Sequence, residues 1–164
     1  MSQALKSRMD RRATRRTDDA GKRTEYLAFG LAGETYGVPI AHVAEILKLP
    51  PITEVPRAPS TVCGVISVRG RLVTVIDLRR RLRLAEGQMD RRARILLVDV
   101  GTGEQIGLLV DEVQQVWRLS AEEVEPANVL GGDQPAHIAG IGRPADARGG
   151  ILILLDLRPI VESP

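Results

Sequence analysis

The sequence contains two copies of one pattern, and both copies close on nearly the same phrase. The first copy ends with Val-Ile-Asp-Leu-Arg at residues 75–79 and the second with Leu-Leu-Asp-Leu-Arg at residues 154–158. Each copy opens with an apolar run, at 26–29 or 95–98, and continues through a Gly-Glu pair to a second apolar run. The period of about 70 residues exceeds the roughly 20 to 50 residues of a solenoid unit. The repeat therefore predicts two fused copies of one small domain.

The apolar residues predict strands as the main element of both copies. Val, Leu and Ile dominate, while the chain holds one Trp, two Tyr and one Phe. Short runs of such residues favour pleated sheet. A hydrophobic fraction of 43% over 164 residues is enough to bury a core. We therefore expect an all-β fold of two small barrels with only short helical turns.

Turn residues and prolines set the expected boundaries of the elements. The apolar spacing from Ile40 to Leu47 predicts one or two helical turns over 41–47, because prolines follow at once. A capping box is expected at 120–123. The remaining sequence predicts hairpins at 25–40 and 94–110, an extended loop at 50–59, strands at 62–68, 72–78 and 151–157, a strand or irregular edge at 111–119, and a linker at 79–92.

Charge separates an N-terminal tail from the rest of the chain. Residues 1–24 hold eight Lys or Arg against three Asp, a net charge of +5, and the other 140 residues hold 15 basic and 18 acidic side chains, a net charge of −3. The tail has few apolar residues, so we expect it to be disordered. It is interpreted either as a solvated extension or as a segment attracted to nucleic acid, anionic lipid or an acidic protein.

A domain at residues 25–162 follows the tail. We expect a first barrel at about 25–88 and a second at about 89–162, because the arginine-rich stretch after residue 78 is the best internal boundary. An exchange of terminal strands between the two barrels is left open.

The inventory of reactive side chains argues against an enzyme. His42 and His137 occupy unmatched places in the two copies, and neither has metal-ligand spacing to Cys63. The glycine-rich segments match neither a phosphate loop nor a dinucleotide fingerprint. We expect no catalytic residue, metal or cofactor. The single cysteine, the lack of a signal-peptide pattern and the lack of a long apolar run predict a soluble cytoplasmic protein.

Comparison of the two copies separates structural from functional candidates. Asp77 and Asp156 hold equivalent positions, so each is predicted to accept backbone amides at the end of a strand. Positions that differ between the copies are better candidates for function. Arg69 lies in a turn of the first copy and has no arginine counterpart in the second, and Glu45 stands where the second copy has Gln115. Both are candidate contact residues, since a guanidinium binds carboxylates well.

Four longer motifs stand out at residues 26–37, 43–46, 64–79 and 107–113. Together they resemble the CheW family of chemotaxis coupling proteins, in a match that covers roughly 25–162. The resemblance implies two SH3-like five-stranded β-barrels without enzymatic activity. It also implies a cytoplasmic scaffold that couples chemoreceptors, the methyl-accepting chemotaxis proteins, to the histidine kinase CheA. Such a protein is recruited to receptor arrays and meets the membrane only through the receptors.

The resemblance further implies which surfaces contact partners. Exposed strand edges of the first barrel would contact a homologous barrel in the CheA regulatory domain, and receptor tips would dock in the groove between the barrels. The matching receptor-contact positions are Val43, Glu45, Gly64, Arg69 and Gly107.

A different class of function stays open as the alternative. Small β-barrels also bind nucleic acid through aromatic stacking and a basic face, and the basic tail could contribute to such binding. The scarcity of aromatic residues and the acidic domain argue against it. We therefore expect no nucleic-acid partner and no small-molecule substrate.

Overall fold

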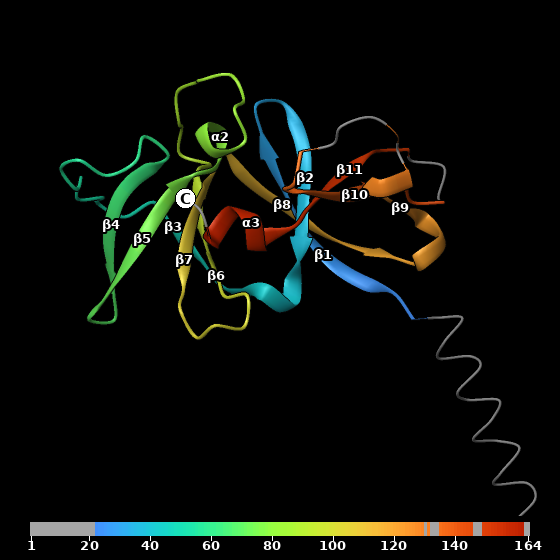
Figure 1. Ribbon diagram of the computed structural model, residues 1–164, viewed down its shortest axis with the longest axis horizontal. Coiled ribbons are helices and arrows are strands. Elements are labelled where there is room, and N and C mark those ends of the chain that lie inside the picture. The colour runs from blue at the N-terminus through green and yellow to red at the C-terminus, as the bar shows by residue number, and fades with distance from the viewer. Residues whose placement is uncertain (1–21, 130, 132–134, 146–148, 163–164) are drawn as a thin grey trace, which may run out of the picture.

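The computed structural model describes residues 22–129, 131, 135–145 and 149–162. They form a mainly β fold of two sheets that lie side by side, one of six strands and one of five (Figure 1). The prediction of an all-β fold with short helices is therefore confirmed. Most of the predicted tail, residues 1–21, lies outside the described residues, and the first strand begins at Thr24.

Each sheet consists of short strands in a simple order. The six-stranded sheet has the order β8 (Glu112–Leu119), β1 (Thr24–Leu31), β2 (Glu34–Pro39), β11 (Leu152–Leu155), β10 (Ile138–Gly142), β9 (Val124–Pro126). The five-stranded sheet has the order β3 (Val43–Lys48), β6 (Arg94–Val98), β7 (Ile106–Val110), β5 (Arg71–Asp77), β4 (Val62–Val68). The helical segments are η1 (Ile40–His42), α2 (Leu78–Arg81), η2 (Ala121–Glu123), η3 (Ala127–Val129) and α3 (Leu157–Glu162).

The two sheets repeat one topology, as the sequence repeat predicts. The order β3-β6-β7-β5-β4 corresponds to β8-β1-β2-β11-β10, and each sheet has one parallel pair, β5 with β7 or β11 with β2. In the five-stranded sheet Thr53 bridges to Val65 at the outer edge of β4, and at the corresponding place the six-stranded sheet has β9. A short helix follows the last strand of each copy, α2 after β5 and α3 after β11.

Strands from both halves of the chain combine in each sheet. The N-terminal hairpin β1–β2 pairs with β8 and β11, and the hairpin β6–β7 pairs with β3 and β5. Each half of the chain therefore contributes a hairpin to the sheet of the other half, an exchange of hairpins.

Burial of both faces of each hairpin explains this exchange. In β1, Leu27 and Phe29 face a large core between the sheets, while Ala28 belongs to a smaller core of the six-stranded sheet. In β6, Leu96 faces the same large core and Ile95 the interior of the five-stranded sheet. A strand covered on both faces reads as a continuous apolar run, as these two do. Each hairpin therefore belongs to one sheet and packs against the other.

Local structure agrees with most of the expected boundaries and differs most at residues 43–48. Ser120 and Glu123 form the predicted capping box at η2. The Asp77 carboxylate accepts from the Arg80 amide and Asp156 from the Arg158 amide, which confirms the structural role predicted for both. Residues 43–48, however, form strand β3 rather than helical turns, because pairing with β6 outweighs the apolar spacing. Only the single turn η1 precedes it.

Candidate functional site

Glu45 and Arg69, which the copy comparison selected, contact each other in the folded protein. Glu45 lies on β3, and Arg69 lies in the turn between β4 and β5. The Arg69 Nη1 atom is 2.9 Å from Glu45 Oε2, and Nη2 donates to Oε1 at 2.9 Å. The pair is bidentate, which gives it a defined geometry. It is also accessible, since the Arg69 side chain is 75% exposed and that of Glu45 32%.

The turn that carries Arg69 holds it in an unusual backbone conformation. Arg69 has φ +48° and Gly70 φ +81°, a pair of positive values typical of the tight turns that join hairpin strands. A left-handed conformation costs a residue with a side chain about 1–2 kcal/mol. The turn of the first hairpin has the same pair of positive φ values, with the small residue Ala32 at φ +49° in the place of the arginine. The arginine therefore has no backbone advantage at this position, which favours a role for its guanidinium.

The other three candidate residues lie close to the same strands but are less accessible. Val43 is the first residue of β3 and packs, half-buried, against the core between the sheets. Gly64 and Gly107 are both buried. A Cβ on Gly64 would lie 2.2 Å from the Thr53 carbonyl oxygen, and one on Gly107 would lie 2.8 Å from Ile95 Cγ2. Gly64 thus permits the close approach of β4 to the segment around Thr53, and Gly107 permits the close approach of β7 to the Ile95 side chain.

The glycine at position 64 has a counterpart with the same environment in the other sheet. A Cβ on Gly140 would lie 2.4 Å from the Glu125 carbonyl oxygen. Each glycine also lies where the register of its strand pair shifts. The agreement between the copies indicates a structural requirement. Among the five candidates, Glu45 and Arg69 therefore offer the side chains most available to a partner.

Strand β3 adds an open edge and exposed apolar side chains to this region. It is an outer strand of the five-stranded sheet, and among the described strands it pairs with β6 alone. Ile46 on β3 is 43% exposed, and Leu49 just beyond it is 45% exposed. An open edge with apolar neighbours is a common setting for protein association. The hairpin β4–β5 contributes Leu72, which is 77% exposed.

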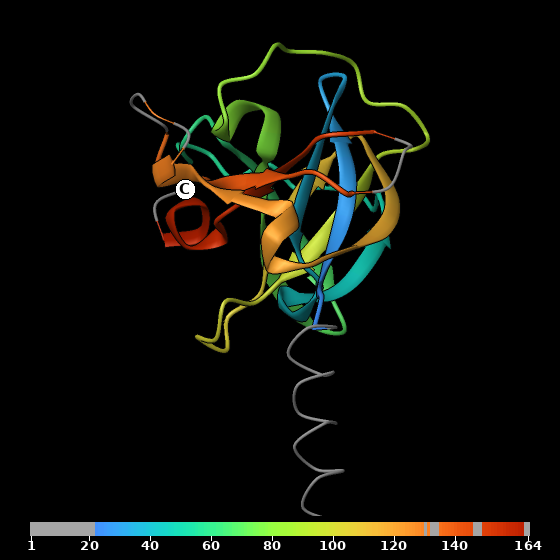
Figure 2. The same ribbon diagram turned by 90° about the vertical axis from the view of Figure 1, so that its right-hand side faces the viewer.

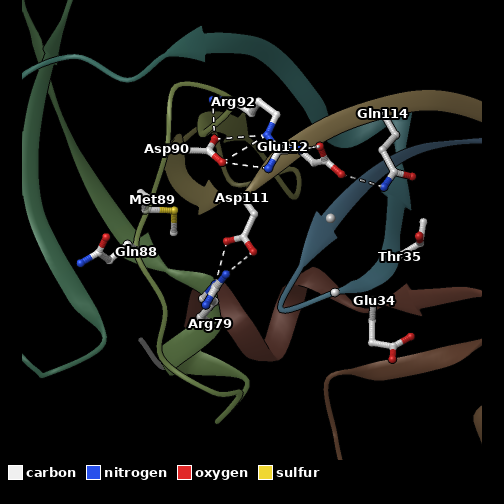
Figure 3. A pocket seen from close by; sticks show the side chains of 12 residues that line it. Glu34, Thr35, Arg79, Gln88, Met89, Asp90, Arg92, Asp111, Glu112 and Gln114 are labelled. Carbon is white, nitrogen blue, oxygen red and sulfur yellow. Dashed lines mark hydrogen bonds and ion pairs between the residues drawn. The ribbon is translucent and has the colours of Figure 1, made fainter.

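A polar hollow at the junction of the sheets was missed by the sequence reasoning. It has a volume of about 280 Å³ and is lined by residues of β1, β2, β8, α2 and the segment 82–93 (Figure 3). That segment passes beside the tip of the first hairpin (Figure 2). The sequence gives only Arg79 of the repeated closing phrase as a hint, because its partner Asp111 is brought beside it by the fold.

The Arg79–Asp111 pair connects three segments at this junction. Arg79 Nε donates to Asp111 Oδ1 at 2.7 Å, and Nη2 also bonds to the carboxylate. The same carboxylate accepts from the Ala32 amide at the tip of the first hairpin, at 2.9 Å. Arg79 Nη1 reaches the Ala85 carbonyl oxygen. Hydrogen bonding to Asp111 raises the pKa of Arg79, so the guanidinium stays charged. This pair joins α2, the first hairpin and the start of β8.

The described residues offer no constellation for catalysis or metal binding. They contain no group of three or more His, Cys, Asp or Glu side chains that could hold a metal ion. Burial raises the pKa of the Cys63 thiol to about 11, which makes it a poor nucleophile. Burial lowers the pKa of His137, and the His42 ring bonds to the Asp99 carbonyl oxygen. The cysteine and the two histidines are therefore held by burial or by a backbone hydrogen bond, and none of them lies in a setting that would activate it for catalysis.

The aromatic residues do not provide the stacking surface that the nucleic-acid alternative requires. Phe29 and Tyr36 are buried and stack on each other, with ring centroids 6.2 Å apart. Tyr26 and Trp117 pack against the core of the six-stranded sheet. Binding of single strands depends on exposed rings.

Among the residues that the structure describes, no helix is long and apolar enough to cross a membrane.

Comparisons with known proteins agree with the fold and with the sequence motifs. The family model described as a CheW-like domain matches residues 25–164. The chain is 29% identical to the chemotaxis protein CheW of Klebsiella aerogenes over 140 residues, which cover 85% of this chain and 82% of that protein. It is 34% identical to the protein FrzA of Myxococcus xanthus over 118 residues, with 71% and 72% covered.

A solved structure supports the same assignment. The crystal structure of the scaffolding protein TtCheW from Thermoanaerobacter tengcongensis superposes with a TM-score of 0.74 at 30% identity, covering 82% of this chain and 90% of that one. Its fold and the family match account together for the paired sheets and the lack of a catalytic set. The chain therefore belongs to the CheW family, the non-catalytic scaffold proteins that couple chemoreceptors to the kinase CheA in chemotaxis signalling.

Proposed function

We propose that this scaffold, in the cytoplasm, bridges the cytoplasmic tip of a chemoreceptor and the regulatory domain of a CheA-type histidine kinase, and that it is recruited to receptor arrays in this way. The observation that carries the proposal is the bidentate pair of Glu45 and Arg69, exposed at positions where the two copies differ. A pair needed only for folding would be expected in both copies.

The proposed receptor surface consists of residues 43–46 of β3 and the turn that carries Arg69. Receptor tips are helical hairpins, so they would present polar side chains to the ion pair and apolar ones to Ile46 and Val43. Gly64 and Gly107 would contribute indirectly, because their close packing holds β4 and β7 in place behind this surface.

The proposed kinase surface is the outer edge of the same sheet around the hairpin β4–β5. Leu72 is the most exposed large apolar side chain of the described residues, and Val55 is 42% exposed. A homologous barrel could cover these side chains by associating edge to edge. The two surfaces meet at the β4–β5 hairpin, so single substitutions there can separate them.

Two substitutions on one hairpin test the proposal. Arg69→Glu should weaken binding of a receptor cytoplasmic fragment about tenfold or more, since it turns a bidentate attraction into repulsion. Leu72→Ser should weaken binding of the kinase regulatory domain and leave the receptor interaction unchanged, since it removes only apolar contact. Both affinities can be measured by isothermal titration calorimetry, with thermal unfolding as the control for the fold.

The two results must be separable. Loss of both partners in Arg69→Glu, with an unchanged thermal midpoint, would mean that receptor and kinase share one surface. Full receptor binding by Arg69→Glu would mean that the Glu45–Arg69 ion pair is not part of the receptor-binding site. Either result would defeat the assignment of sites.

A further inference from the structure

The end of the β3–β6 ladder pairs two positive charges. Lys48 on β3 lies directly opposite Arg94 on β6. Like charges at such cross-strand positions destabilise a sheet. In the other sheet the corresponding strands β8 and β1 place Arg118 opposite Glu25, with the Arg118 Nε atom 3.9 Å from the carboxylate. One copy thus compensates the cation at this position and the other does not.

The positive charges at this end of the five-stranded sheet are compensated only in part, because the Asp90 carboxylate beside Arg91 is itself paired with Arg92. Lys48, Arg91 and Arg94 line one shallow hollow, and none of them forms an ion pair with any described residue. The acid in the hollow, Asp90, is bound by Arg92, with Nη2 2.9 Å from Oδ2 (Figure 3). Hydrogen bonds from Arg92 lower the pKa of Asp90 and mark this carboxylate as already engaged.

The hollow contains a guanidinium held in a fixed position and also has apolar lining residues, two features of binding surfaces. Arg94 Nη1 donates to the Arg91 carbonyl oxygen at 2.9 Å and to the Ala93 carbonyl oxygen at 2.8 Å. These bonds hold the guanidinium in place and leave its other N–H groups free of bonds to the described residues. Leu49 is 45% exposed and Met89 half-buried in the same hollow. A guanidinium fixed in advance loses little entropy when it binds a carboxylate.

We propose that this basic hollow, formed by Lys48, Arg91 and Arg94 with Leu49, binds an acidic segment of a partner protein. The partner supplies the carboxylates that Glu25 supplies in the other sheet, and an apolar side chain of the segment covers Leu49. The surrounding domain favours such a short segment over a long polyanion, because it carries a net charge of −3 outside residues 1–24. The hollow is separate from the Glu45–Arg69 pair and does not depend on receptor binding there.

Arg94→Glu is the decisive variant because it copies the arrangement of the other sheet. The probe is a fluorescein-labelled peptide of sequence Glu-Glu-Leu-Glu-Glu-Leu-Glu, titrated with the full chain and followed by fluorescence anisotropy. We expect binding that weakens with salt, and a loss of about tenfold or more in Arg94→Glu. The thermal midpoint of this variant should equal or exceed that of the wild type, since opposite charges then face each other across the strands.

Arg158→Glu is the matched control. It changes the net charge equally, keeps the same basic tail and replaces an exposed residue of α3 that forms no ion pair with the described residues. It should bind the peptide like the wild type.

Three results would overturn the proposal. They are no measurable binding of the peptide, equal loss in both variants, and undiminished binding by Arg94→Glu. Binding of phosphatidylserine vesicles or of a single-stranded 20-mer oligonucleotide in place of the peptide, and lost in Arg94→Glu, would also overturn it in favour of a lipid or nucleic-acid site.

Discussion

At the scale of single residues, Glu123 shows how one carboxylate can fix a turn. It accepts hydrogen bonds from the Ser120 amide and hydroxyl, both at 3.0 Å, and from the Ala145 amide. It also pairs with Arg23 at 2.7 Å, which ties the residue before β1 to the turn after β8. These bonds stabilise the charged form and lower the pKa of Glu123 from 4.5 to about 2.

This shift predicts a defined pH dependence of stability. A carboxyl group whose pKa falls on folding stabilises the native state above its unfolded pKa, and the contribution is lost as the pH falls toward the folded pKa. Glu123→Gln should therefore lower the thermal midpoint at pH 7, and its difference from the wild type should shrink between pH 4.5 and about pH 2. Calorimetric scans across this range measure it. A difference independent of pH would contradict the assigned role of the charge.

Comparison of the two copies predicts the role of matched residues and leaves the role of unmatched ones as a proposal. Asp77 and Asp156 match, and each accepts a backbone amide just after its strand, from Arg80 or Arg158, whereas Glu45 and Arg69 do not match and form an exposed pair. The comparison could not show that these two side chains meet, because β3 and the β4–β5 turn are distant in sequence. It also missed Asp111, whose partner is fixed only by the fold.

At the scale of elements, the Arg79–Asp111 pair links α2, the tip of the first hairpin and the start of β8. Both side chains are largely buried, with exposed fractions of 14% and 21%. Removing the charge of Asp111 would leave Arg79 with a weaker partner at the junction. The relative placement of the sheets therefore depends on this carboxylate.

Asp111→Asn should lower the free energy of unfolding by about 1.5–3 kcal/mol, the usual range for a lost hydrogen bond to a charged group. Urea denaturation followed by circular dichroism measures the change. Asp156→Asn is the control, because asparagine caps a helix about as well as aspartate and so should have little effect. Equal losses in the two variants would contradict a special role for the junction.

The elements also show where periodicity misleads. Residues 43–48 have apolar residues at helical spacing, yet they form β3, because β6 offers a complete strand partner. Burial alternates along this strand, with Ile46 and Lys48 facing outward, and the apolar spacing in the sequence does not show this alternation. Proline-rich residues 50–59 form the expected loop, and Thr53 of this loop pairs with Val65 of β4.

At the scale of the whole molecule, the exchange of hairpins makes the two sheets one unit. The core between them takes side chains from β1, β2, β5, β6, β7 and β11, so neither sheet is complete without the other half of the chain. The repeat in the sequence predicted the matched topologies, but a repeat alone cannot tell tandem from exchanged pairing. That choice depends on which faces are buried. A single unit with surfaces on one sheet suits a scaffold that holds two partners at fixed positions.

The most direct measurement is a pull-down of the purified chain with a CheA regulatory domain and a receptor cytoplasmic fragment from the same cell, with and without residues 1–21. Truncation at residue 21 keeps Arg23 and its bond to Glu123. We predict a ternary complex that survives removal of the tail, because the proposed surfaces lie on the five-stranded sheet. Failure of the folded chain to bind either partner would contradict the bridging role.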